Sequence, residues 1–570
     1  MPDNSAWNMF IFREGRVIFP GAKLKSGLEQ AIACATGPEQ IVSALLRAGE
    51  YECATADVGS PDAAHCAAIT DVLAAALLGE PLERAALRRA VGAVSPPASA
   101  RVSPPEGFTY YALHPLQFAE LANEIPDALP TAVVGIRSIG TTLSAVVTAA
   151  LRARGCTAGR ITVRPTGHPY SRQTCFTPQQ KTWLQTRPAA SHFLVVDEGP
   201  GMSGSSFLSV GEALAEAGIP RERITFLCSR WADPATLLAD NAAARWRQFR
   251  SLVVKSNRFV PADAGLYIGS GRWRAQFLQP SQWPAAWTHM ERLKYLSADG
   301  HCYLAFEGLG RFGADVNERA RCLAEANFGV APQSPELGFG RYPLASGSRL
   351  TRKDTSAQVL DRIAEYCAFR YAHFAGAERS ATDLETPLLH NLKEEFGFDL
   401  SPAPMRLNAP CRVVIPDNRL MPHNWIRAGD RLLKLNAAAH GDDHFMPGPT
   451  DIAWDLAGAI VEWDLNARAA GYLIARYRRT SGDDPRSRLL DYLLAYSMFR
   501  TGYCRMAAAA MTEEHETSRL TSAYQRYRAQ TQSVLREWLE RAEPYQVRNF
   551  EGVSGGVPGR ALRAPELQTI

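Results

Sequence analysis

The chain has 570 residues, of which 46% are hydrophobic and 21% charged, with 62 Lys or Arg against 58 Asp or Glu. These proportions are those of a globular protein and exclude a disordered chain, which is poorer in apolar residues. The balanced charge argues against a dedicated nucleic-acid binder, which carries a basic excess. At roughly 100–200 residues per domain, the length predicts about three to five domain-sized units.

The eleven cysteines are dispersed and form no CxxC pair. The clusters typical of zinc sites are therefore missing, and reduced thiols in a cytosol are favoured. The first residues contain no apolar stretch of signal-peptide length, and no run approaches the roughly 18 apolar residues of a membrane span. We therefore expect a cytoplasmic protein with neither a membrane nor a nucleic acid as partner.

Residues 1–105 are predicted to form an N-terminal accessory α/β segment. Strand-like runs occupy 9–12 and 16–19, and an Ala-rich helical pattern covers 63–78. The prolines and serines between 94 and 105 lack apolar periodicity, which indicates a connector.

Residues 106–235 are predicted to form an α/β domain with a parallel sheet, because apolar strands alternate there with helical patterns. In such sheets ligands bind at the carboxyl ends of the strands. The loops after Ile136, Arg164 and Asp197 are therefore where a site is expected. Strands are expected at 132–136, 160–164, 192–197 and 223–228, and helices at 141–153 and 205–217.

The second half is predicted to be a mostly helical α+β domain. Residues 236–300 are a linker and the start of this domain, which occupies 301–540 and opens with a strand at 302–306. Residues 541–570 are predicted to be a loose tail, because glycines crowd its sequence.

The strongest motif is an apolar strand that ends in two adjacent acids, Asp197 and Glu198. A glycine-rich loop follows, and the hydroxyl-rich run from Ser203 to Ser206 opens a helix. Backbone N–H groups at a helix start together with serine hydroxyls make an anion site, and adjacent carboxylates can accept hydrogen bonds from vicinal hydroxyls. The combination predicts a sugar-phosphate site.

This segment resembles the PRPP-binding motif of type I phosphoribosyltransferases, with Asp-Glu where many members have two Asp. The run from Gly135 to Thr142 resembles the pyrophosphate loop of that family. The segment from Arg164 to Arg172 follows the next strand, where the family keeps a mobile loop that closes over the reactants. The resemblance covers about residues 106–230. It implies displacement of magnesium pyrophosphate at ribose C1, with PRPP, Mg²⁺ and a small-molecule acceptor as ligands.

The resemblance also implies a role for each matching residue. Developing charge on pyrophosphate would be neutralised by arginines and Mg²⁺, and a closing loop would exclude water. The two acids would hold the ribose and meet the metal only through PRPP. The catalytic set is Arg137, Asp197, Glu198 and Arg172, and the substrate-binding set is Ser138, Ile139, Gly140, Gly199, Met202, Ser203, Gly204, Ser205, Ser206, His168 and Tyr170.

Structural interpretations compete with these roles. The run from Val195 to Ser206 could be an ordinary strand–loop–helix turn of another α/β domain, and Arg137 a surface ion-pair partner. His168, Tyr170 and Arg172 could be plain loop residues. An aromatic segment at 108–115 is a candidate hood over the acceptor, with packing against the sheet as its alternative.

Residues from about 270 to 540 resemble aminoglycoside-phosphotransferase-like kinases. Three runs match the catalytic loop, the metal-binding strand and a following helix of that family: Pro416 to Trp425, Leu432 to Asn436 and Gly448 to Gly458. The resemblance implies Asp417 as the base, His423 or Asn424 near a metal and Asp455 as a brace of the loop. It makes a nucleotide a candidate ligand.

Departures from the kinase pattern favour a degenerate, structural domain. Asn436 stands where a metal-binding Asp is expected and is a poorer Mg²⁺ ligand, with Asp442 or Asp443 as candidates to replace it. Ala305 stands where such kinases carry the Lys that pairs with phosphates. The cluster of His440, Asp442, Asp443 and His444 has the ligand types of a transition-metal site, with a solvated turn as the alternative.

The main interpretation is therefore an α/β phosphoribosyltransferase-like domain fused to an α+β kinase-like domain. One alternative is a regulatory protein that senses PRPP or a nucleotide through a pseudokinase module. Another is a bifunctional transferase and small-molecule kinase. A homodimer is a candidate assembly.

Overall fold

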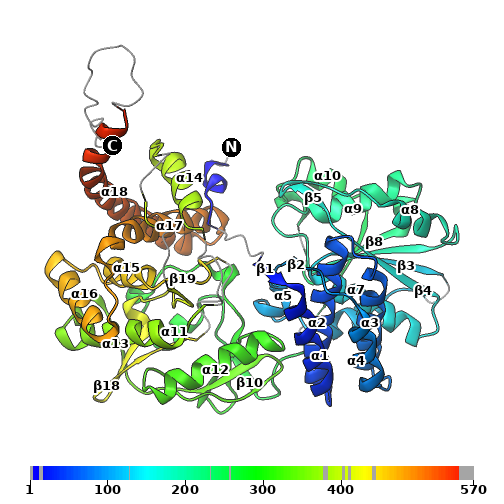
Figure 1. Ribbon diagram of the computed structural model, residues 1–570, viewed down its shortest axis with the longest axis horizontal. Helices are drawn as coiled ribbons and strands as arrows, with labels where there is room; N and C mark the ends of the chain where they lie inside the picture. Colours follow the sequence, from blue (N-terminus) through cyan, green and yellow to red (C-terminus); the bar gives the residue numbers. More distant parts are fainter. Residues whose placement is uncertain are drawn as a thin grey trace.

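The computed structural model describes residues 4–11, 17–126, 129–231, 233–255, 258–376, 383–400, 405–407, 412–438 and 445–550. Figure 1 shows two lobes, one built around a parallel sheet and the other around smaller antiparallel sheets with a helical layer. No helix in the described ranges is long and apolar enough to cross a membrane.

The first lobe contains the parallel five-stranded sheet that the alternating pattern predicts. Its strand order is β4-β3-β7-β8-β9, and every neighbouring pair is parallel. The central strands are buried on both faces, which explains their unbroken apolar runs. The strands are β3 (Thr131–Ile136), β4 (Ala158–Val163), β7 (His192–Val196), β8 (Ile224–Cys228) and β9 (Arg250–Val253).

Helices cover both faces of this sheet. Because side chains alternate along a strand, Val134 faces the core beneath α8, α9 and α10, whereas Val133 faces α2, α3 and α7. Residues 1–105 thus contribute helices to the layer over one face of the sheet. The helices of this lobe are α1 (Gly21–Cys34), α2 (Pro38–Asp57), α3 (Ala63–Leu77), α4 (Arg84–Ala93), α5 (Glu106–Thr109), α6 (Leu116–Ala122), α7 (Ile139–Ala153), α8 (Pro178–Gln185), α9 (Ser205–Glu216) and α10 (Ala242–Trp246).

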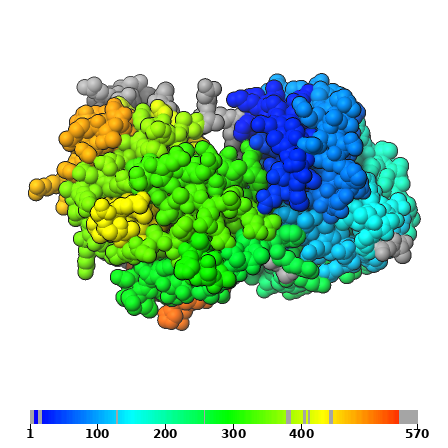
Figure 2. Space-filling view, turned by 90° about the horizontal axis from the view of Figure 1, so that it is seen from below, coloured from blue at the N-terminus to red at the C-terminus, as the bar shows by residue number. Residues whose placement is uncertain are grey.

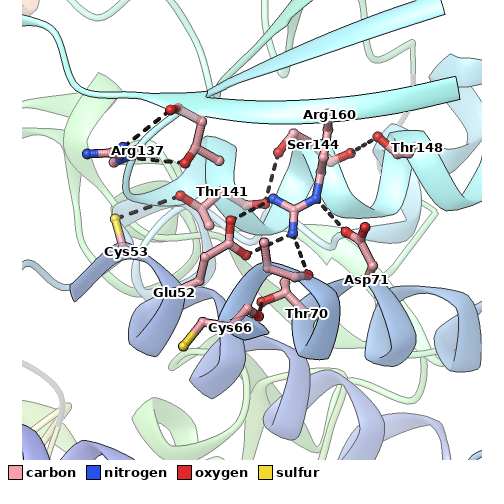
Figure 3. A network of polar contacts seen from close by, with 12 residues as sticks. Glu52, Cys53, Cys66, Thr70, Asp71, Arg137, Thr141, Ser144, Thr148 and Arg160 are labelled. Carbon is pink, nitrogen blue, oxygen red and sulfur yellow. Dashed lines mark hydrogen bonds and ion pairs between the residues drawn. The ribbon is translucent and has the colours of Figure 1, made fainter. Parts of the chain in front are cut away.

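A buried arginine joins the N-terminal helices to the sheet (Figure 3). Arg160 on β4 donates to both carboxylate oxygens of Glu52 on α2, at 2.7 and 2.8 Å, and to Asp71 on α3 at 2.5 Å. The side chains of Arg160 and Glu52 are each 3% exposed. Removing one partner of such a pair leaves an uncompensated buried charge, so the network fixes both helices against the edge of the sheet.

The second lobe carries a five-stranded antiparallel sheet of order β10-β11-β12-β14-β13. Its strands are β10 (Ala264–Tyr267), β11 (Lys294–Ser297), β12 (Cys302–Phe306), β13 (Gln333–Glu336) and β14 (Phe339–Pro343). A small sheet, β15 (Ser348–Arg349), β17 (Trp425–Ala428) and β18 (Arg431–Lys434), and a pair, β16 (Val413–Val414) and β19 (Thr450–Asp451), lie beyond it. The helices are α11 (Trp273–Phe277), α12 (Arg311–Glu325), α13 (Ala357–His373), α14 (Glu385–Phe396), α15 (Ala453–Glu462), α16 (Ala467–Ser481), α17 (Leu489–Ala510) and α18 (Glu514–Phe550).

A glycine loop after β12 joins the two lobes. The Leu309 amide donates to the carbonyl of Phe108 at 2.9 Å, and a Cβ at Gly310, where φ is +57°, would lie 3.0 Å from Ser43 Oγ. Arg311 forms an ion pair with Glu50 on α2. The blue N-terminal helices and green second-lobe segments accordingly meet without a gap in Figure 2. This loop, Gly308 to Gly313, docks one lobe on the other.

Three expectations about the chain ends and connectors are corrected. Residues 9–11 are not a strand: the Phe10 amide donates to Asn391 at 2.7 Å, which holds this segment on the second lobe. The connector at 94–105 contains β2 (Ser99–Val102), which pairs with β1 (Val17–Pro20). The expected tail from 541 starts later, because α18 continues to Phe550, and residues 551–570 lie outside the described residues.

Candidate functional site

The first candidate site lies where β3, β4 and β7 end. Asp197 follows β7, and its Oδ1 accepts the Glu198 amide at 2.9 Å. The amide of Gly140, at the start of α7, also bonds to the Asp197 carboxylate. A Cβ at Gly140 would lie 2.3 Å from the carbonyl oxygen of Val196. The glycine therefore allows the turn after β3 to touch the acid pair.

The turn after β3 is strained at Ser138, where φ is +106° and ψ is −107°. Non-glycine residues rarely adopt such a conformation, and it costs about 1–3 kcal/mol. Strained residues cluster at ligand sites. Ser138 belongs to the predicted pyrophosphate loop, together with buried Ile139 and Gly140.

Both acids have raised pKa values. Burial raises the pKa of Asp197 to about 7, although two backbone amides and Arg164 favour its ionised form. Burial first, and then the nearby carboxylates of Glu106 and Asp197, together raise the pKa of Glu198 to about 8. Titratable groups shifted by burial and close charges are typical of functional sites.

The arginines of this site share one carboxylate. Arg137 Nη1 lies 3.0 Å from Asp57 Oδ1, and Arg164 Nη2 lies 2.5 Å from Asp57 Oδ2. Arg164 also donates to the carbonyl of Arg137 at 2.8 Å. Arg137 thus forms the ion pair of the structural alternative, and Asp57 holds its guanidinium at the predicted pyrophosphate loop.

The serine run forms a cradle at the start of α9. Ser203 and Ser205 both donate through Oγ to the carbonyl of Pro169, at 2.9 and 2.6 Å. Gly204, the N-cap residue, adopts φ +68° and has no side chain, and Ser203 Oγ accepts the Ser205 amide at 3.2 Å, which leaves the next amides of the first turn uncapped. First-turn amides without a capping side chain are ready to bind an anion. A carbonyl oxygen thus contacts the hydroxyls that are predicted to bind phosphate.

That carbonyl belongs to a hairpin, β5 (Thr166–His168) and β6 (Ser171–Gln173), within the predicted mobile loop. Arg172 donates to the carbonyl of Gly167 at 2.5 Å, so its guanidinium folds onto its own hairpin. The His168 and Tyr170 rings lie 5.6 Å apart. The hairpin contacts the cradle through its Pro169 carbonyl, and His168 and Tyr170 flank that residue.

The rest of the predicted phosphate loop supports the cradle with its backbone. The carbonyl of Met202 accepts the Leu238 amide at 3.0 Å, and the carbonyl of Ser203 accepts the Ala239 amide at 3.2 Å. Gly199 lies against Arg230, and Ser206 is half-buried in the first turn of α9. These contacts fix the loop between β7 and α9.

Several site residues escaped the motif comparison. Glu106 and the Gly107 amide meet Glu198 from α5, and Arg164 and Asp57 reach the site from β4 and α2. Arg164 opens the segment that resembles the mobile loop, but the resemblance assigns it no role, and no sequence signal points to Asp57. The candidate hood segment is packed, as its structural alternative holds, with Phe108 1% and Tyr110 3% exposed.

The donor set fits a magnesium ion that arrives with its substrate. Within the described ranges, no three His, Cys, Asp or Glu side chains form a metal cluster. Mg²⁺ is commonly bound largely through substrate phosphates, and Asp197 and Glu198 would meet it through the sugar phosphate that they hold.

A second candidate site is a cavity of about 1020 Å³ in the second lobe. It lies between the antiparallel sheet, the loop at 419–426 and α18. His423, Asn424 and Asn436 line it, as the kinase resemblance implies. Burial and surrounding cations, Arg349 first, lower the pKa of His423 to about 3, so this imidazole is neutral at physiological pH.

Asp417 does not fit the expected role of a base. Its side chain is 0% exposed and forms an ion pair with Lys434 Nζ at 3.0 Å. The Tyr366 hydroxyl donates to it as well. A fully buried carboxylate that is paired with a lysine is out of reach of a substrate. Arg419, two residues on, lines the cavity instead.

Asp455 braces the loop, as expected. Its carboxylate accepts the amides of Asp417 and Asn418 at 2.8 and 2.9 Å. Asn424 donates from Nδ2 to the carbonyl of Arg419 at 3.0 Å, so its amide also holds the loop. His440, Asp442, Asp443 and His444 lie outside the described residues.

The sheet of the second lobe carries a cation opposite Ala305. Lys294 on β11 lies directly across from Ala305 on β12, and Lys294 lines the cavity. The cation comes from the neighbouring strand. The motif comparison missed it because strand pairing is not visible in the sequence.

Solved structures of kinases and phosphotransferases are similar to about two fifths of the chain. No family model matches the chain, and no curated protein matches it. An ethanolamine kinase of Plasmodium vivax is 11% identical, with a TM-score of 0.29 over 42% of this chain and 79% of its own. A macrolide 2'-phosphotransferase from Brachybacterium faecium is 18% identical, with a TM-score of 0.29 over 41% and 88%.

The choline kinase of Streptococcus pneumoniae is 13% identical, with a TM-score of 0.28 over 42% of this chain and 89% of its own. These similar structures are phosphotransferases, and none of the three is a phosphoribosyltransferase. At such TM-scores the likeness assigns no activity to this chain. The contacts within each site are what distinguish the candidate functions.

Proposed function

We propose that the chain is a transferase of phosphorylated ribose, which uses PRPP and Mg²⁺ and releases pyrophosphate. The observation that supports this most is that the candidate ligand-binding groups meet at the carboxyl ends of the central strands of the parallel sheet. Asp197 and Glu198, the strained turn at Ser138 and the serine cradle of α9 all meet where β3 and β7 end. Ligands bind at that edge in open α/β sheets.

In this proposal each group has a distinct task. The 5-phosphate of PRPP replaces the Pro169 carbonyl on Ser203 and Ser205 and meets the first amides of α9. Asp197 and Glu198 accept hydrogen bonds from the ribose hydroxyls. When bound, Mg²⁺ neutralises charge on the pyrophosphate oxygens.

Arg137 neutralises the departing pyrophosphate, whose negative charge grows in the transition state. Asp57 holds that guanidinium by the ion pair at 3.0 Å. The hairpin closes over the reactants and excludes water, which would otherwise hydrolyse PRPP. Its Pro169 carbonyl keeps the cradle hydroxyls bonded until the phosphate arrives.

The test is calorimetry with PRPP and Mg²⁺. Asp197→Asn with Glu198→Gln should weaken PRPP binding at least tenfold, which is about 1.4 kcal/mol. Glu222→Gln is the matched control, because Glu222 is exposed just before β8, at the opposite edge of the sheet. Unchanged affinity in the double variant would remove the assignment.

A second candidate function is phosphoryl transfer in the second lobe, as in the bifunctional interpretation. Lys294 favours it, because this cation faces the cavity across from Ala305. The buried Asp417–Lys434 pair opposes it. An ATP-consumption assay with a panel of small alcohols decides: turnover that Lys294→Met abolishes would establish the activity, and no turnover would leave the first lobe as the transferase.

A further inference from the structure

The short helix α5 lies between the first site and the second lobe. Its Gly107 amide forms a hydrogen bond to the Glu198 carboxylate. The two residues are in close contact, because a Cβ at Gly107 would lie 2.9 Å from Cδ of Glu198. The next residue, Phe108, accepts the Leu309 amide of the second lobe through its carbonyl, at 2.9 Å. Neighbouring residues of α5 therefore contact an acid of the site and the other lobe.

A second contact joins the same segment to the second lobe. Tyr110 follows α5 directly and is 3% exposed. The guanidinium of Arg292, which precedes β11, lies over the Tyr110 ring at 5.1 Å from its centroid. At that distance a cation is attracted to the face of an aromatic ring. The second lobe thus holds the segment from Glu106 to Tyr110 through a backbone hydrogen bond and a cation–π contact.

The glycine loop that contacts α5 is itself anchored on α2. Its Arg311 forms an ion pair with Glu50, whose side chain is 8% exposed. The neighbouring turn between β13 and β14 is anchored on the same helix, because the Leu337 amide donates to Glu39 at 2.9 Å. Glu39 and Glu50 are separated by about three helical turns, which places them on one face of α2. The second lobe therefore contacts α2 along that face.

Helix α2 is fixed by the first lobe itself, whereas α5 depends more on its neighbours. Arg160 on β4 donates two hydrogen bonds to Glu52 of α2. Asp57, at the end of α2, pairs with Arg137 and Arg164. Helix α5 comprises four residues, and a single turn is not stable by itself, because its few hydrogen bonds do not offset the cost of nucleation. The position of α5 is therefore set by packing, part of which the second lobe provides.

We propose that the second lobe positions Glu198 for the ribose hydroxyls of PRPP, because its glycine loop, anchored on α2, holds α5 against that carboxylate. The identity of the ligand rests on the proposed function of the first lobe, but the coupling between the lobes does not. The position of Arg137 depends on Asp57 and on the firmly held α2. Undocking the glycine loop should therefore weaken binding of PRPP, while binding of free pyrophosphate remains.

Reversing the charge of Arg311 tests this inference. Arg311→Glu brings a like charge to Glu50, which should undock the loop. We expect at least fivefold weaker binding of PRPP with Mg²⁺ in calorimetry, unchanged binding of pyrophosphate, and faster amide hydrogen exchange across residues 106–113. Arg311→Lys keeps the ion pair and should behave as wild type. Arg321→Glu is the matched control and should change none of these, because Arg321 is exposed on the same helix, α12, and pairs with Glu318 within it.

A second variant tests the contact of α5 with the acid without a change at the lobe interface. The new Cβ of Gly107→Ala would displace the Glu198 carboxyl, so PRPP binding should weaken at least fivefold and pyrophosphate binding should remain. Gly92→Ala on α4 is its control, because nothing lies within 4 Å of a Cβ added there.

The outcomes separate this inference from the proposed function. A wild-type protein that binds no PRPP would refute the proposed function, and hydrogen exchange alone would then decide the coupling between the lobes. Wild-type exchange across residues 106–113 in Arg311→Glu would overturn the inference. Wild-type PRPP affinity in folded Arg311→Glu and Gly107→Ala proteins would overturn it as well, as would an equal loss of pyrophosphate binding.

Discussion

The two lobes place their charged groups in opposite ways. At the carboxyl ends of the parallel strands, the half-buried acids Asp197 and Glu198 accept hydrogen bonds from backbone amides and have raised pKa values. In the second lobe, Asp417 and Asp455 are 0% and 1% exposed and hold the backbone in place, while Lys294 lines the cavity.

The difference shows that a motif acid is functional only if its surroundings leave it available. Asp417 stands in a run that resembles a catalytic loop, yet Lys434 and Tyr366 take up its carboxylate. Asp197 stands in a run that resembles a ribose-binding loop, and its partners are amides that orient it. The first arrangement stabilises a fold, and the second can accept a ligand.

The largest expected effect tests whether the second-lobe acids are structural. Lys434→Met should lower the free energy of unfolding by about 3–5 kcal/mol, because it removes the lysine counter-charge of the buried Asp417 carboxylate. Lys434→Met with Asp417→Leu should regain part of this loss. Chemical denaturation measures both. A Lys434→Met protein as stable as wild type would mean that the pair is not a structural element.

The next effect concerns the first lobe. Arg137→Ala should reduce kcat by about a hundredfold, by analogy with the removal of one transition-state donor, with a smaller change in KM. Pyrophosphate release is the measurement, and thermal melting is the control for folding. Release at the wild-type rate would show that Arg137 serves only its ion pair with Asp57.

A smaller effect is expected at the serine cradle. Ser203→Ala with Ser205→Ala removes two hydroxyl donors to the phosphate, and hydrogen bonds to charged groups contribute about 1.5–3 kcal/mol each. PRPP affinity should therefore fall by tenfold or more, whereas binding of free pyrophosphate should remain. Calorimetry with both ligands compares the two. Equal losses for PRPP and pyrophosphate would place the 5-phosphate elsewhere.

The smallest effect is a pH dependence of stability. The pKa values of Asp197 and Glu198, about 7 and about 8 in the folded chain, exceed their ordinary values. The folded state therefore binds more protons than the unfolded chain between about pH 4 and 8, and the free energy of unfolding falls as pH rises through that window.

Asp197→Asn with Glu198→Gln should remove this part of the slope, so the variant should gain stability over wild type as pH rises. Urea unfolding at several pH values measures the difference. Parallel profiles for the two proteins would mean that the two carboxyls titrate normally in the folded state.

The sequence by itself determined the first-lobe scaffold. The apolar runs that became β3, β7 and β8 are long enough and unbroken enough to predict strands buried on both faces, and their alternation with helices predicted a parallel sheet. The acid pair and the serine run were also readable, because both lie within one short segment that ends a strand and starts a helix.

Only the tertiary structure decided which groups meet. Asp57, Arg164 and Glu106 join the first site from α2, β4 and α5, and no local pattern encodes that convergence. Lys294 faces the second cavity because β11 pairs with β12 in one register. Asp417 is not available to a ligand, because Lys434, 17 residues along the chain, pairs with its carboxylate. Local periodicity specifies elements, but long-range packing sets the charges and access of each side chain.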